Sequence, residues 1–255
     1  ALLPFEPETM RRLGGPPCTY VGHPLYERAE RLRPNVEEAR RSLSNPPVLL
    51  VMPGSRRSEI YRMASVFGEA ATLVSQHAGA LDVVVPAVPR LAETVAAAVR
   101  TWRTPARVVI NSDDKDAAYR IARAALVKSG TSTLEVAVAG IPMVAGYKVP
   151  VFEEIIARTL LSVDTTILPN LVLGEKVVPQ FYQRDFTPAK LAGALAPLLA
   201  ETPERRKQIE ALRRLEGIMT SGAASPSDRA AAVVLNYALQ GSAIPETVAS
   251  ARPTA

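Results

Sequence analysis

ALVKSGTSTLE, residues 125–135, is the stretch that decides the fold of this 255-residue chain. Its beginning belongs to the apolar run Ala124–Val127, which is typical of a buried strand. Ser129-Gly130-Thr131 is typical of a tight turn. An apolar run follows Ser132, and Ser132 with Glu135 matches the capping box of a helix N-terminus. The stretch therefore predicts a strand, a turn and a helix in direct succession.

A strand that passes through small residues into a helix can form an anion site. The first N–H groups of a helix have no partner inside the helix, and the helix dipole adds partial positive charge there. Gly130 would let a phosphate approach the backbone closely. The carboxylate of Glu135 can accept hydrogen bonds from ribose hydroxyl groups. The alternative is that Ser132 and Glu135 only cap a structural helix, and the stretch by itself leaves both interpretations open.

Further apolar runs predict four more strands, at residues 48–52, 81–85, 107–110 and 142–145. Helical periodicity predicts helices between them, at residues 59–77, around 91–102, from 112 onward, and from 132 to a cap at Gly140. Strands that alternate with helices predict an α/β fold, namely a Rossmann-like parallel sheet with helices on both faces. In such a sheet, ligands bind outside the carboxyl ends of the strands.

The rest of the chain predicts fewer regular elements. Residues 19–21 predict a short strand, residues 34–44 and 151–161 predict helices, and residues 166–171 predict a loop. Thr-Pro or Ser-Pro pairs at 187–188, 202–203 and 225–226 predict helix starts. We therefore divide the chain into an N-terminal or interdomain segment (1–46), the Rossmann-like domain (47–200), C-terminal helices (201–240) and a disordered tail (241–255). Since the chain does not begin with Met, we expect that a preceding part is missing.

Composition narrows the class of protein. Hydrophobic residues make up 47% of the chain, which is enough for a sizeable core. A single cysteine and two histidines predict neither a disulfide framework nor a metal centre. No apolar run is long enough for a transmembrane helix or a signal peptide. The net charge of +5 suits phosphates, anionic lipid or nucleic acid, or is simply a solvated basic surface.

A second loop, Pro53–Ser58, follows a predicted strand and therefore lies at the same edge of the sheet as the turn after Val127. Gly54 provides a flexible backbone, Ser55 a hydroxyl group, and Arg56 a planar guanidinium that suits a diphosphate. No Gly-Lys-Ser/Thr ends this loop and no GxGxxG follows a strand, so neither a Walker A site nor a dinucleotide site is supported.

Three other polar features have two interpretations each. His23 either faces a cleft or is an ordinary loop residue. Asp113-Asp114 is either a metal-binding pair or, as we prefer, a helix start where the dipole favours acidic residues. Asn170 is explained equally well by a turn and by a ligand contact.

Six motifs occur together and in order. They are Leu3-Pro4-Phe5-Glu6, Val21-Gly22-His23-Pro24, Pro53-Gly54-Ser55-Arg56 with Glu59, Ser129-Gly130-Thr131-x-x-Leu134-Glu135, Pro142-Met143-Val144-x-Gly146-Tyr147 and Leu168-Pro169-Asn170-Leu171. This ordered set resembles lipid-A-disaccharide synthase, a glycosyltransferase family of the GT-B architecture. The resemblance runs from the first residues to about Leu239.

The resemblance implies an activity. Members of the family transfer 2,3-diacylglucosamine from UDP-2,3-diacylglucosamine to 2,3-diacylglucosamine 1-phosphate (lipid X), forming a β-1,6-linked lipid A disaccharide and UDP without a metal or other cofactor. The chain looks like the C-terminal, UDP-binding domain of such an enzyme. The general base is expected in the family's N-terminal domain, which has no counterpart here. An enzyme with acylated substrates is expected in the cytoplasm, peripherally bound to the inner membrane, and a homo-oligomer is possible.

The resemblance also implies contacts for UDP. Gly54, Ser55 and Arg56 would contact the diphosphate together with Ser129, Gly130 and Thr131. Glu135 would hold the ribose, Asn170 would contact the nucleotide or diphosphate, Tyr147 would line the base pocket, and His23 would reach the cleft.

Two other functions compete with this one. A UDP-sugar 2-epimerase would share the half-fold, and a UDP-binding fragment would have no activity of its own. Nucleic-acid binding is disfavoured because aromatic residues, which would stack on bases, make up 5% of the chain.

Overall fold

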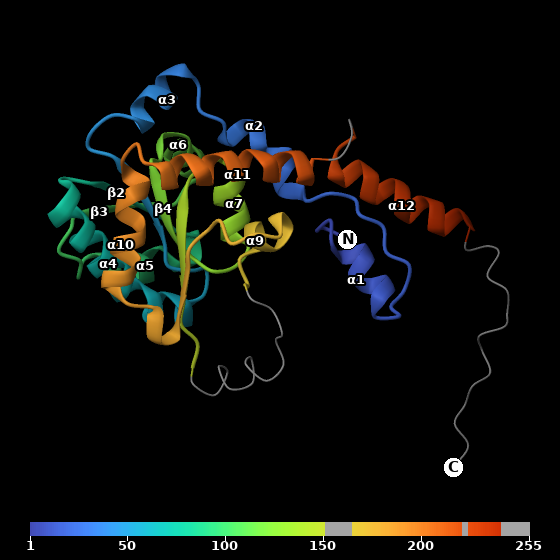
Figure 1. Ribbon diagram of the computed structural model, residues 1–255, viewed down its shortest axis with the longest axis horizontal. Coiled ribbons are helices and arrows are strands. Elements are labelled where there is room, and N and C mark those ends of the chain that lie inside the picture. The colour runs from blue at the N-terminus through green and yellow to red at the C-terminus, as the bar shows by residue number, and fades with distance from the viewer. Residues whose placement is uncertain (151–164, 221–223, 241–255) are drawn as a thin grey trace, which may run out of the picture. The chain divides into compact units, whose positions relative to one another are not determined.

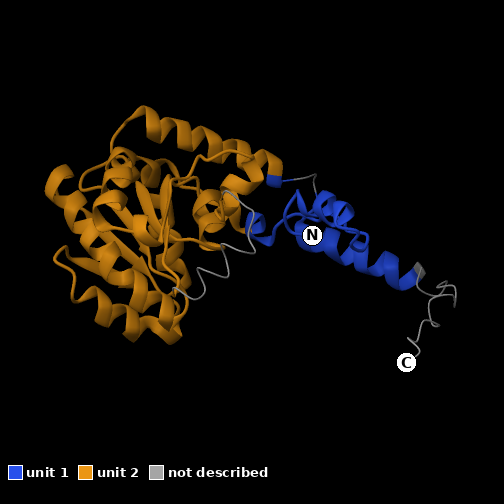
Figure 2. Ribbon diagram, turned by 60° about the horizontal axis from the view of Figure 1, so that its bottom comes forward, with its two compact units in different colours: residues 1–27, 219–255 blue, residues 28–218 orange. Residues whose placement is uncertain are grey.

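The structure of the chain is a computed structural model that describes residues 1–150, 165–220 and 224–240 (Figure 1). The chain forms two compact units: a larger one from Arg28 to Ile218, and a smaller one that combines Ala1–Glu27 with the chain from Met219 onward (Figure 2). The predicted boundary after residue 46 thus falls inside the larger unit, and the predicted group 201–240 is divided between both. The helix predicted at 151–161 and the tail 241–255 lie outside the described residues.

A parallel sheet of six strands forms the centre of the larger unit (Figure 1). Its strands are β1 (Val48–Met52), β2 (Asp82–Pro86), β3 (Ala106–Val109), β4 (Ala124–Lys128), β5 (Met143–Tyr147) and β6 (Gln180–Tyr182). They lie in the order β3-β2-β1-β4-β5-β6, and every neighbouring pair is parallel. Leu50 of β1 lies opposite Val84 of β2 and Ala125 of β4, so the strand order reverses between β1 and β4.

Helices cover both faces of this sheet, as predicted. On one face, α4 (Arg57–Ala78) contacts α5 (Ala92–Val99) and α10 (Pro188–Leu199). On the other face, α6 (Ser112–Ile121) contacts α2 (Ala29–Leu32) and α3 (Val36–Ser42), and α7 (Ser132–Val138) contacts α9 (Leu168–Leu173). The 3-10 turns η2 (Pro89–Leu91) and η3 (Gln183–Asp185) and nearly all of the long helix α11 (Pro203–Met219) also lie in this unit, and the 3-10 turn η1 (Pro24–Arg28) ends at its first residue. The predicted Rossmann-like α/β fold is confirmed.

The core explains why β1 reads as a continuous apolar run. Side chains alternate between the two faces of a strand, yet both Leu49 and Leu50 are fully buried. A central parallel strand covered by helices on both sides needs apolar residues at every position. On one side, Leu49 packs with Ile60 and Phe67 of α4, in agreement with the helical periodicity that predicted this helix.

Helix starts were predicted well where a side chain closes the first turn. The Thr187 hydroxyl accepts from the N–H of Lys190 at the start of α10, and Ser225 accepts from the N–H of Asp228 at the start of α12 (Pro226–Gln240). At α6, Asn111 accepts from the N–H of Asp114, so Asp113-Asp114 is indeed a helix start.

Two predictions of secondary structure were wrong, and one strand was missed. Residues 19–21 form no strand, and residues 166–171, predicted as a loop, include the start of α9. The strand β6 was missed because its three residues are all half-buried and carry no apolar run. A short strand at the edge of a sheet needs no strong sequence signal, since its neighbour β5 supplies the hydrogen bonds.

The smaller unit contains α1 (Glu6–Arg12) and α12. Within it, Arg229 of α12 lies 5.9 Å from the centroid of the Tyr20 ring and donates to the Tyr20 carbonyl at 3.0 Å. The N–H of Ser227 donates to the carboxylate of Glu27. In the part of the chain that the structure describes, no helix combines the length and apolar character needed to cross a bilayer.

Candidate functional site

A pocket of about 550 Å³ opens in the larger unit at the carboxyl ends of β1, β2, β3 and β4. Its walls come from the ends of these strands and the loops that follow them: Met52, Gly54 and Ser55; Pro86–Pro89; Ile110–Ser112; and Lys128 with Gly130–Ser132. Arg28, Leu32, Lys115, Asp116, Tyr119 and Glu135 complete the wall. The pocket lies where the strand order reverses, which is the usual ligand position in an open α/β sheet.

The loop after β1 is held by a buried carboxylate. Glu59, on the first turn of α4, has a side chain that is 4% exposed, and it accepts from the N–H groups of Ser55 at 2.9 Å and Arg56 at 3.2 Å. Gly54 has a φ of +129°, and a Cβ at this position would lie 2.6 Å from the Glu59 carboxylate. The loop therefore needs glycine here for both backbone conformation and space.

Lys128, the last residue of β4, joins the second loop to the same carboxylate. Its Nζ lies 3.2 Å from Glu59 Oε1 and 4.8 Å from the centroid of the Tyr147 ring. Burial raises the pKa of Glu59, but the N–H groups of Ser55 and Arg56 and the ammonium of Lys128 outweigh this, so the pKa lies below its usual value. Glu59 is therefore ionised at neutral pH and keeps the positive charge of Lys128 at the pocket wall.

The turn after β4 meets the pocket only in part. The N–H of Ser129 donates to the Gly146 carbonyl of β5 at 3.0 Å, and its hydroxyl lies 3.3 Å from both Thr166 Oγ1 and the Tyr182 hydroxyl. Ser129 thus belongs to the sheet and is not among the residues that line the pocket. Gly130 and Thr131 do line it, and no backbone hydrogen bond between described residues uses their N–H groups.

The predicted capping box of α7 is wrong. Thr131 is the N-cap residue and has a helical backbone, so Ser132 is already inside the helix. The Ser132 hydroxyl donates to the Lys128 carbonyl at 3.2 Å. Glu135 turns away from the helix end toward the pocket, where its side chain is 33% exposed. The structure therefore removes the capping interpretation and leaves the Glu135 carboxylate available to a ligand.

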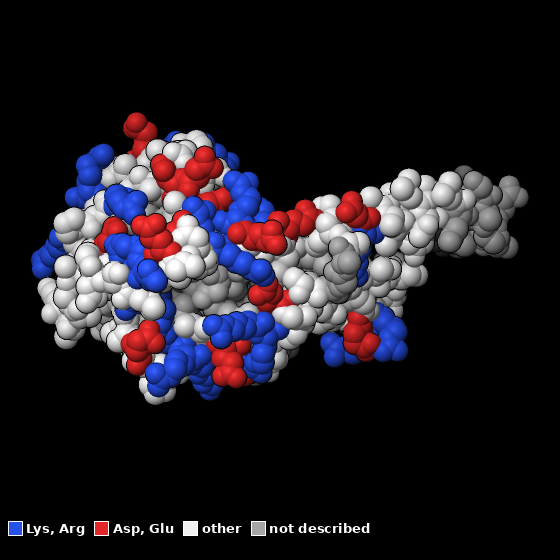
Figure 3. Space-filling model, turned by 90° about the horizontal axis from the view of Figure 1, so that it is seen from above, with Lys and Arg blue, Asp and Glu red and all other residues white. Residues whose placement is uncertain are grey.

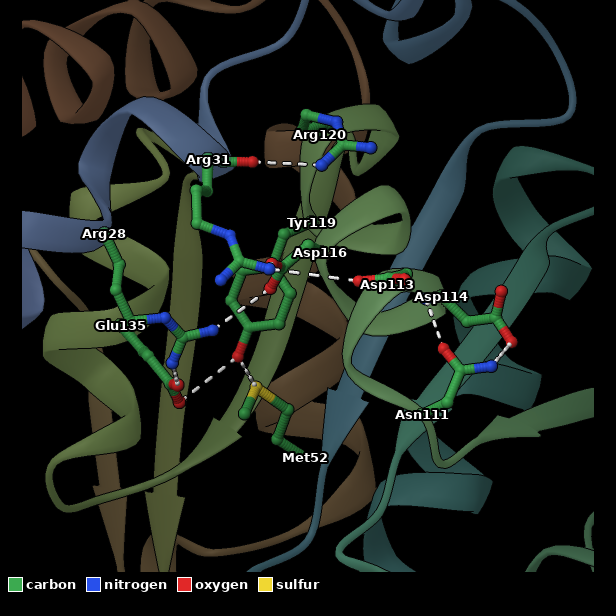
Figure 4. Close-up of polar contacts among 10 residues, drawn as sticks. All are labelled: Arg28, Arg31, Met52, Asn111, Asp113, Asp114, Asp116, Tyr119, Arg120 and Glu135. Atoms are coloured by element: carbon green, nitrogen blue, oxygen red, sulfur yellow. Dashed lines mark hydrogen bonds and ion pairs between the residues drawn. The ribbon is translucent and has the colours of Figure 1, made fainter.

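Two side chains from other elements face the carboxylate of Glu135, one as a hydrogen-bond donor and one as an ion-pair partner (Figure 4). Its Oε2 lies 3.4 Å from the Tyr119 hydroxyl and its Oε1 lies 3.8 Å from Arg28 Nη1. Arg28 Nη2 is also 3.2 Å from the buried carboxylate of Asp116, and Arg31 approaches the same carboxylate at 3.3 Å. Burial, and then the charge of Glu135, raises the pKa of Tyr119 well above its usual value, so the hydroxyl keeps its proton.

The remaining predicted residues lie in different settings. The Arg56 side chain is 77% exposed at the start of α4, and its Nη1 is 3.5 Å from Glu59 Oε1. Asn170 is 1% exposed, accepts from the N–H groups of Val177 and Val178, and donates to the Val178 carbonyl. Of the two interpretations of Asn170, the structure therefore favours the turn.

His23 belongs to the smaller unit, where its Nδ1 accepts from the N–H of Leu25 at 3.2 Å. Burial lowers its pKa more than the charge of Glu6 raises it. Among the described residues, no group of three or more His, Cys, Asp or Glu side chains is arranged to hold a metal ion.

The sequence reasoning missed Lys128, Arg28, Asp116 and Tyr119. Lys128 carries a readable signal, since it is the first polar residue at the carboxyl end of a buried strand whose following loop had been singled out. Arg28, Asp116 and Tyr119 carry none, because they come from elements that reach the pocket only in the folded chain.

A parallel α/β sheet with a pocket at the reversal of strand order places this chain among the open α/β proteins, which bind ligands at that position. Residues 1–234 match the family model described as lipid-A-disaccharide synthetase, so the chain belongs to this family. This confirms the resemblance found in the sequence.

Curated relatives agree with the family model. The chain is 54% identical over 235 residues to a lipid-A-disaccharide synthase of Nitrobacter winogradskyi, with 92% of this chain and 59% of the relative covered. It is 51% identical over 236 residues to one of Rhodopseudomonas palustris strain HaA2, with 92% and 60% covered. The chain thus spans about 60% of the length of these relatives.

A solved structure shows a similar fold. The α,α-trehalose 6-phosphate synthase of Burkholderia multivorans superposes with a TM-score of 0.53 at 13% identity, over 88% of this chain and 50% of that chain. At this identity the likeness concerns the fold alone.

Proposed function

We propose that this chain carries the UDP-binding part of a lipid-A-disaccharide synthase. The enzyme would transfer 2,3-diacylglucosamine from UDP-2,3-diacylglucosamine to 2,3-diacylglucosamine 1-phosphate and release UDP. The observation that carries the proposal is the pocket at the reversal of strand order, in a chain that belongs to the lipid-A-disaccharide synthetase family. As the resemblance implies, the proposed reaction uses no metal or other cofactor.

The transfer exchanges one C–O bond for another. A hydroxyl oxygen of the acceptor forms a bond to the anomeric carbon of the donor sugar, and the bond from that carbon to UDP breaks. The electron pair leaves with UDP, so negative charge develops on the diphosphate. The proton of the hydroxyl goes to a general base, which we place in the family's N-terminal domain.

Donors and a cation at the pocket wall would stabilise the leaving diphosphate. We assign this role to the N–H groups of Gly130 and Thr131 and to the ammonium of Lys128, because these groups line the pocket and are held in place before the ligand arrives. We no longer include Ser129 among these donors, because its N–H donates to the Gly146 carbonyl. Arg56 is exposed beside Ser55, and turning toward a phosphate would cost it only the 3.5 Å contact with Glu59.

The order of the strands suggests where the other parts of the donor lie. Glu135 would accept from the ribose hydroxyl groups. The loops after β2 and β3, Pro86–Pro89 and Ile110–Ser112, would enclose the uracil ring. Tyr147 ends β5, on the far side of β4 from these loops, so we place it toward the donor sugar instead of the base.

Acylated substrates would require the enzyme to work at a membrane surface. We propose peripheral association with the cytoplasmic face of the inner membrane, supported by the net charge of +5. On the face drawn in Figure 3, Lys and Arg side chains of the larger unit are interspersed with Asp and Glu, so we expect weak, salt-dependent attraction. Flotation with anionic liposomes at low salt tests this, and protein that stays at the bottom of the gradient would count against it. Sedimentation velocity would measure whether the chain self-associates.

Calorimetric titration of UDP into the purified chain tests the binding function. Replacing Glu135 by alanine should weaken binding by about 1.5–3 kcal/mol, because hydrogen bonds to a charged acceptor are lost. Glu69→Ala is the matched control, since Glu69 is an exposed glutamate of α4, away from this pocket. A folded chain that gives no heat with UDP would contradict the proposal.

Incubation with donor and acceptor lipid distinguishes the activities. The disaccharide and UDP are the products of a synthase, an isomerised UDP-sugar alone is the product of an epimerase, and UDP binding without product identifies a binding part that needs the rest of the enzyme.

A further inference from the structure

Glu135 is held on both sides before any ligand is bound. Figure 4 shows Arg28 and Tyr119 directed toward its carboxylate from different elements. Arg28 Nη1 forms an ion pair with Oε1 at 3.8 Å, and the Tyr119 hydroxyl donates a hydrogen bond to Oε2 at 3.4 Å. A carboxylate oxygen accepts about two hydrogen bonds. Oε2 therefore keeps about one acceptor position and Oε1 about two, all on a carboxylate whose orientation is held by two partners.

Tyr119 is itself rigidly placed. It is 5% exposed, and its hydroxyl also lies 3.3 Å from the sulfur of Met52 at the end of β1. Tyr119 follows Asp116 by three residues on α6, so both side chains lie on the same face of this helix and line the pocket. The helix thus supplies a donor for Glu135 and an acceptor for Arg28 from a single face.

Asp116 fixes Arg28. Its side chain is 6% exposed, with Oδ1 3.2 Å from Arg28 Nη2 and Oδ2 3.3 Å from Arg31 Nη2. A buried carboxylate is strongly destabilising without a cationic partner, so this contact resists rearrangement. Arg28 spans two carboxylates, one buried and one facing the pocket. If it followed Glu135 away from Asp116, that buried carboxylate would keep Arg31 as its one remaining cationic partner among the described residues.

We propose that Tyr119 and Arg28, with Asp116 behind Arg28, are positioning residues that set Glu135 as the acceptor for ribose hydroxyl groups and make the site select ribonucleotides over 2′-deoxyribonucleotides. The inference rests on the proposed function, because it names what selects the sugar of the bound nucleotide. A free glutamate loses side-chain freedom when it binds, whereas one already held by a hydrogen bond and an ion pair loses little. The advantage exists only for ligands that carry the hydroxyl group.

The ratio of the dissociation constants for 2′-deoxy-UDP and UDP measures how strongly the site selects the ribose 2′-hydroxyl group. We expect the unchanged chain to prefer UDP by about tenfold, the value of one hydrogen bond to a charged acceptor. Tyr119→Phe should lower the ratio by about threefold, since the carboxylate loses its hydrogen bond from Tyr119 but keeps its ion pair with Arg28. Affinity for 2′-deoxy-UDP should change by less than about twofold, because that ligand lacks the selected contact.

Matched variants distinguish the loss of Glu135 positioning from a general loss of structure. Tyr61→Phe removes a hydroxyl from an exposed tyrosine of α4 and should leave the ratio unchanged. Arg28→Lys keeps the charge and should retain more of the ratio than Arg28→Met. Thermal unfolding of each variant checks that it is folded, and Tyr119→Phe carries the test if the Arg28 variants unfold.

The outcomes are distinct. A ratio unchanged in Tyr119→Phe and in Arg28→Met would overturn the inference while UDP binding upholds the proposed function. An equal loss of affinity for both nucleotides would also overturn it, since that is the result of structural damage. Absence of UDP binding in the unchanged chain would overturn the proposed function and the inference together.

Discussion

Lys128 offers the sharpest test of the site, because its ammonium is held between Glu59 and the ring of Tyr147. Lys128→Met keeps most of the side-chain volume and removes the charge. Breaking a buried ion pair from one side costs about 3–5 kcal/mol. Glu59 keeps two backbone N–H donors, so we expect a smaller loss of about 2 kcal/mol. In a unit of this size that corresponds to a fall in Tm of about 4–8 °C.

The way in which the stability loss of Lys128→Met changes with pH also follows from the structure. In the folded chain the pKa of Glu59 lies below its usual value, so Glu59 contributes stability above that usual value and loses the contribution as the pH falls through its folded pKa. Without Lys128, burial is opposed by fewer groups and the folded pKa of Glu59 rises. The stability difference between Lys128→Met and the unchanged chain should therefore be largest at neutral pH. It should narrow as the pH falls from the raised folded pKa of Glu59 in the variant toward its lower folded pKa in the unchanged chain.

Urea unfolding at several pH values measures these differences. Lys190→Met is the control, since Lys190 pairs with Asp185 at an exposed position and should cost less than about 1 kcal/mol. A double-mutant cycle with Glu59→Gln gives the coupling between the two residues. Additive effects in that cycle, or a stability difference that does not change with pH, would refute the reasoning. Lys128→Met should also weaken UDP binding by about 1.5–3 kcal/mol.

Three further predictions concern single positions. Gly54→Ala should destabilise the chain by about 1–3 kcal/mol in urea unfolding, because the added Cβ meets Glu59 at a left-handed backbone position, and unchanged stability would contradict the geometry. Asn170→Ala should lower stability by about 2–4 kcal/mol through three lost hydrogen bonds, with unchanged UDP affinity at temperatures where it is folded, so weakened binding without unfolding would restore its role as a ligand contact. Arg56→Ala should weaken UDP binding about tenfold in calorimetry and shift Tm by less than about 1 °C, since its side chain is exposed. Arg57→Ala is its control, and equal effects of both would argue against a specific contact.

The sequence was informative where burial leaves little choice of residue. β1 and β4 lie in the middle of the sheet, so both faces of each strand demand apolar side chains and the runs stand out. β6 and α9 carry no such demand along their whole length. β6 is a half-buried edge strand, and α9 is a single short helix whose position depends on Asn170 bonding to residues that follow it.

The site could be predicted as far as local motifs reach. Five residues predicted from two stretches far apart in sequence all line one pocket: Gly54, Ser55, Gly130, Thr131 and Glu135. Their role in binding UDP stays a prediction. A local motif was insufficient for groups whose direction depends on neighbouring strands, such as the backbone N–H of Ser129. The turn after β4 fixes the place of Ser129, but only the pairing with β5 directs its N–H into the sheet.

Supporting residues were beyond the reach of motifs altogether. Arg28 lies 107 positions before Glu135 in the numbering, and Asp116 has the sequence context of an ordinary helix start. Their contact requires that Arg28 be brought next to α6, which no local pattern specifies.

The carboxylate of Glu59 contacts both halves of the sheet and connects them. It accepts from the backbone after β1 and from the last side chain of β4, which are the two strands on either side of the order reversal. Moving either loop away would leave one of the two charges, that of Glu59 or that of Lys128, without its partner. Neither loop can therefore open independently at a low cost in free energy. The amide protons of Ser55 and Arg56 should therefore exchange with solvent at similar rates. Replacing Lys128, a residue of the other loop, should accelerate both.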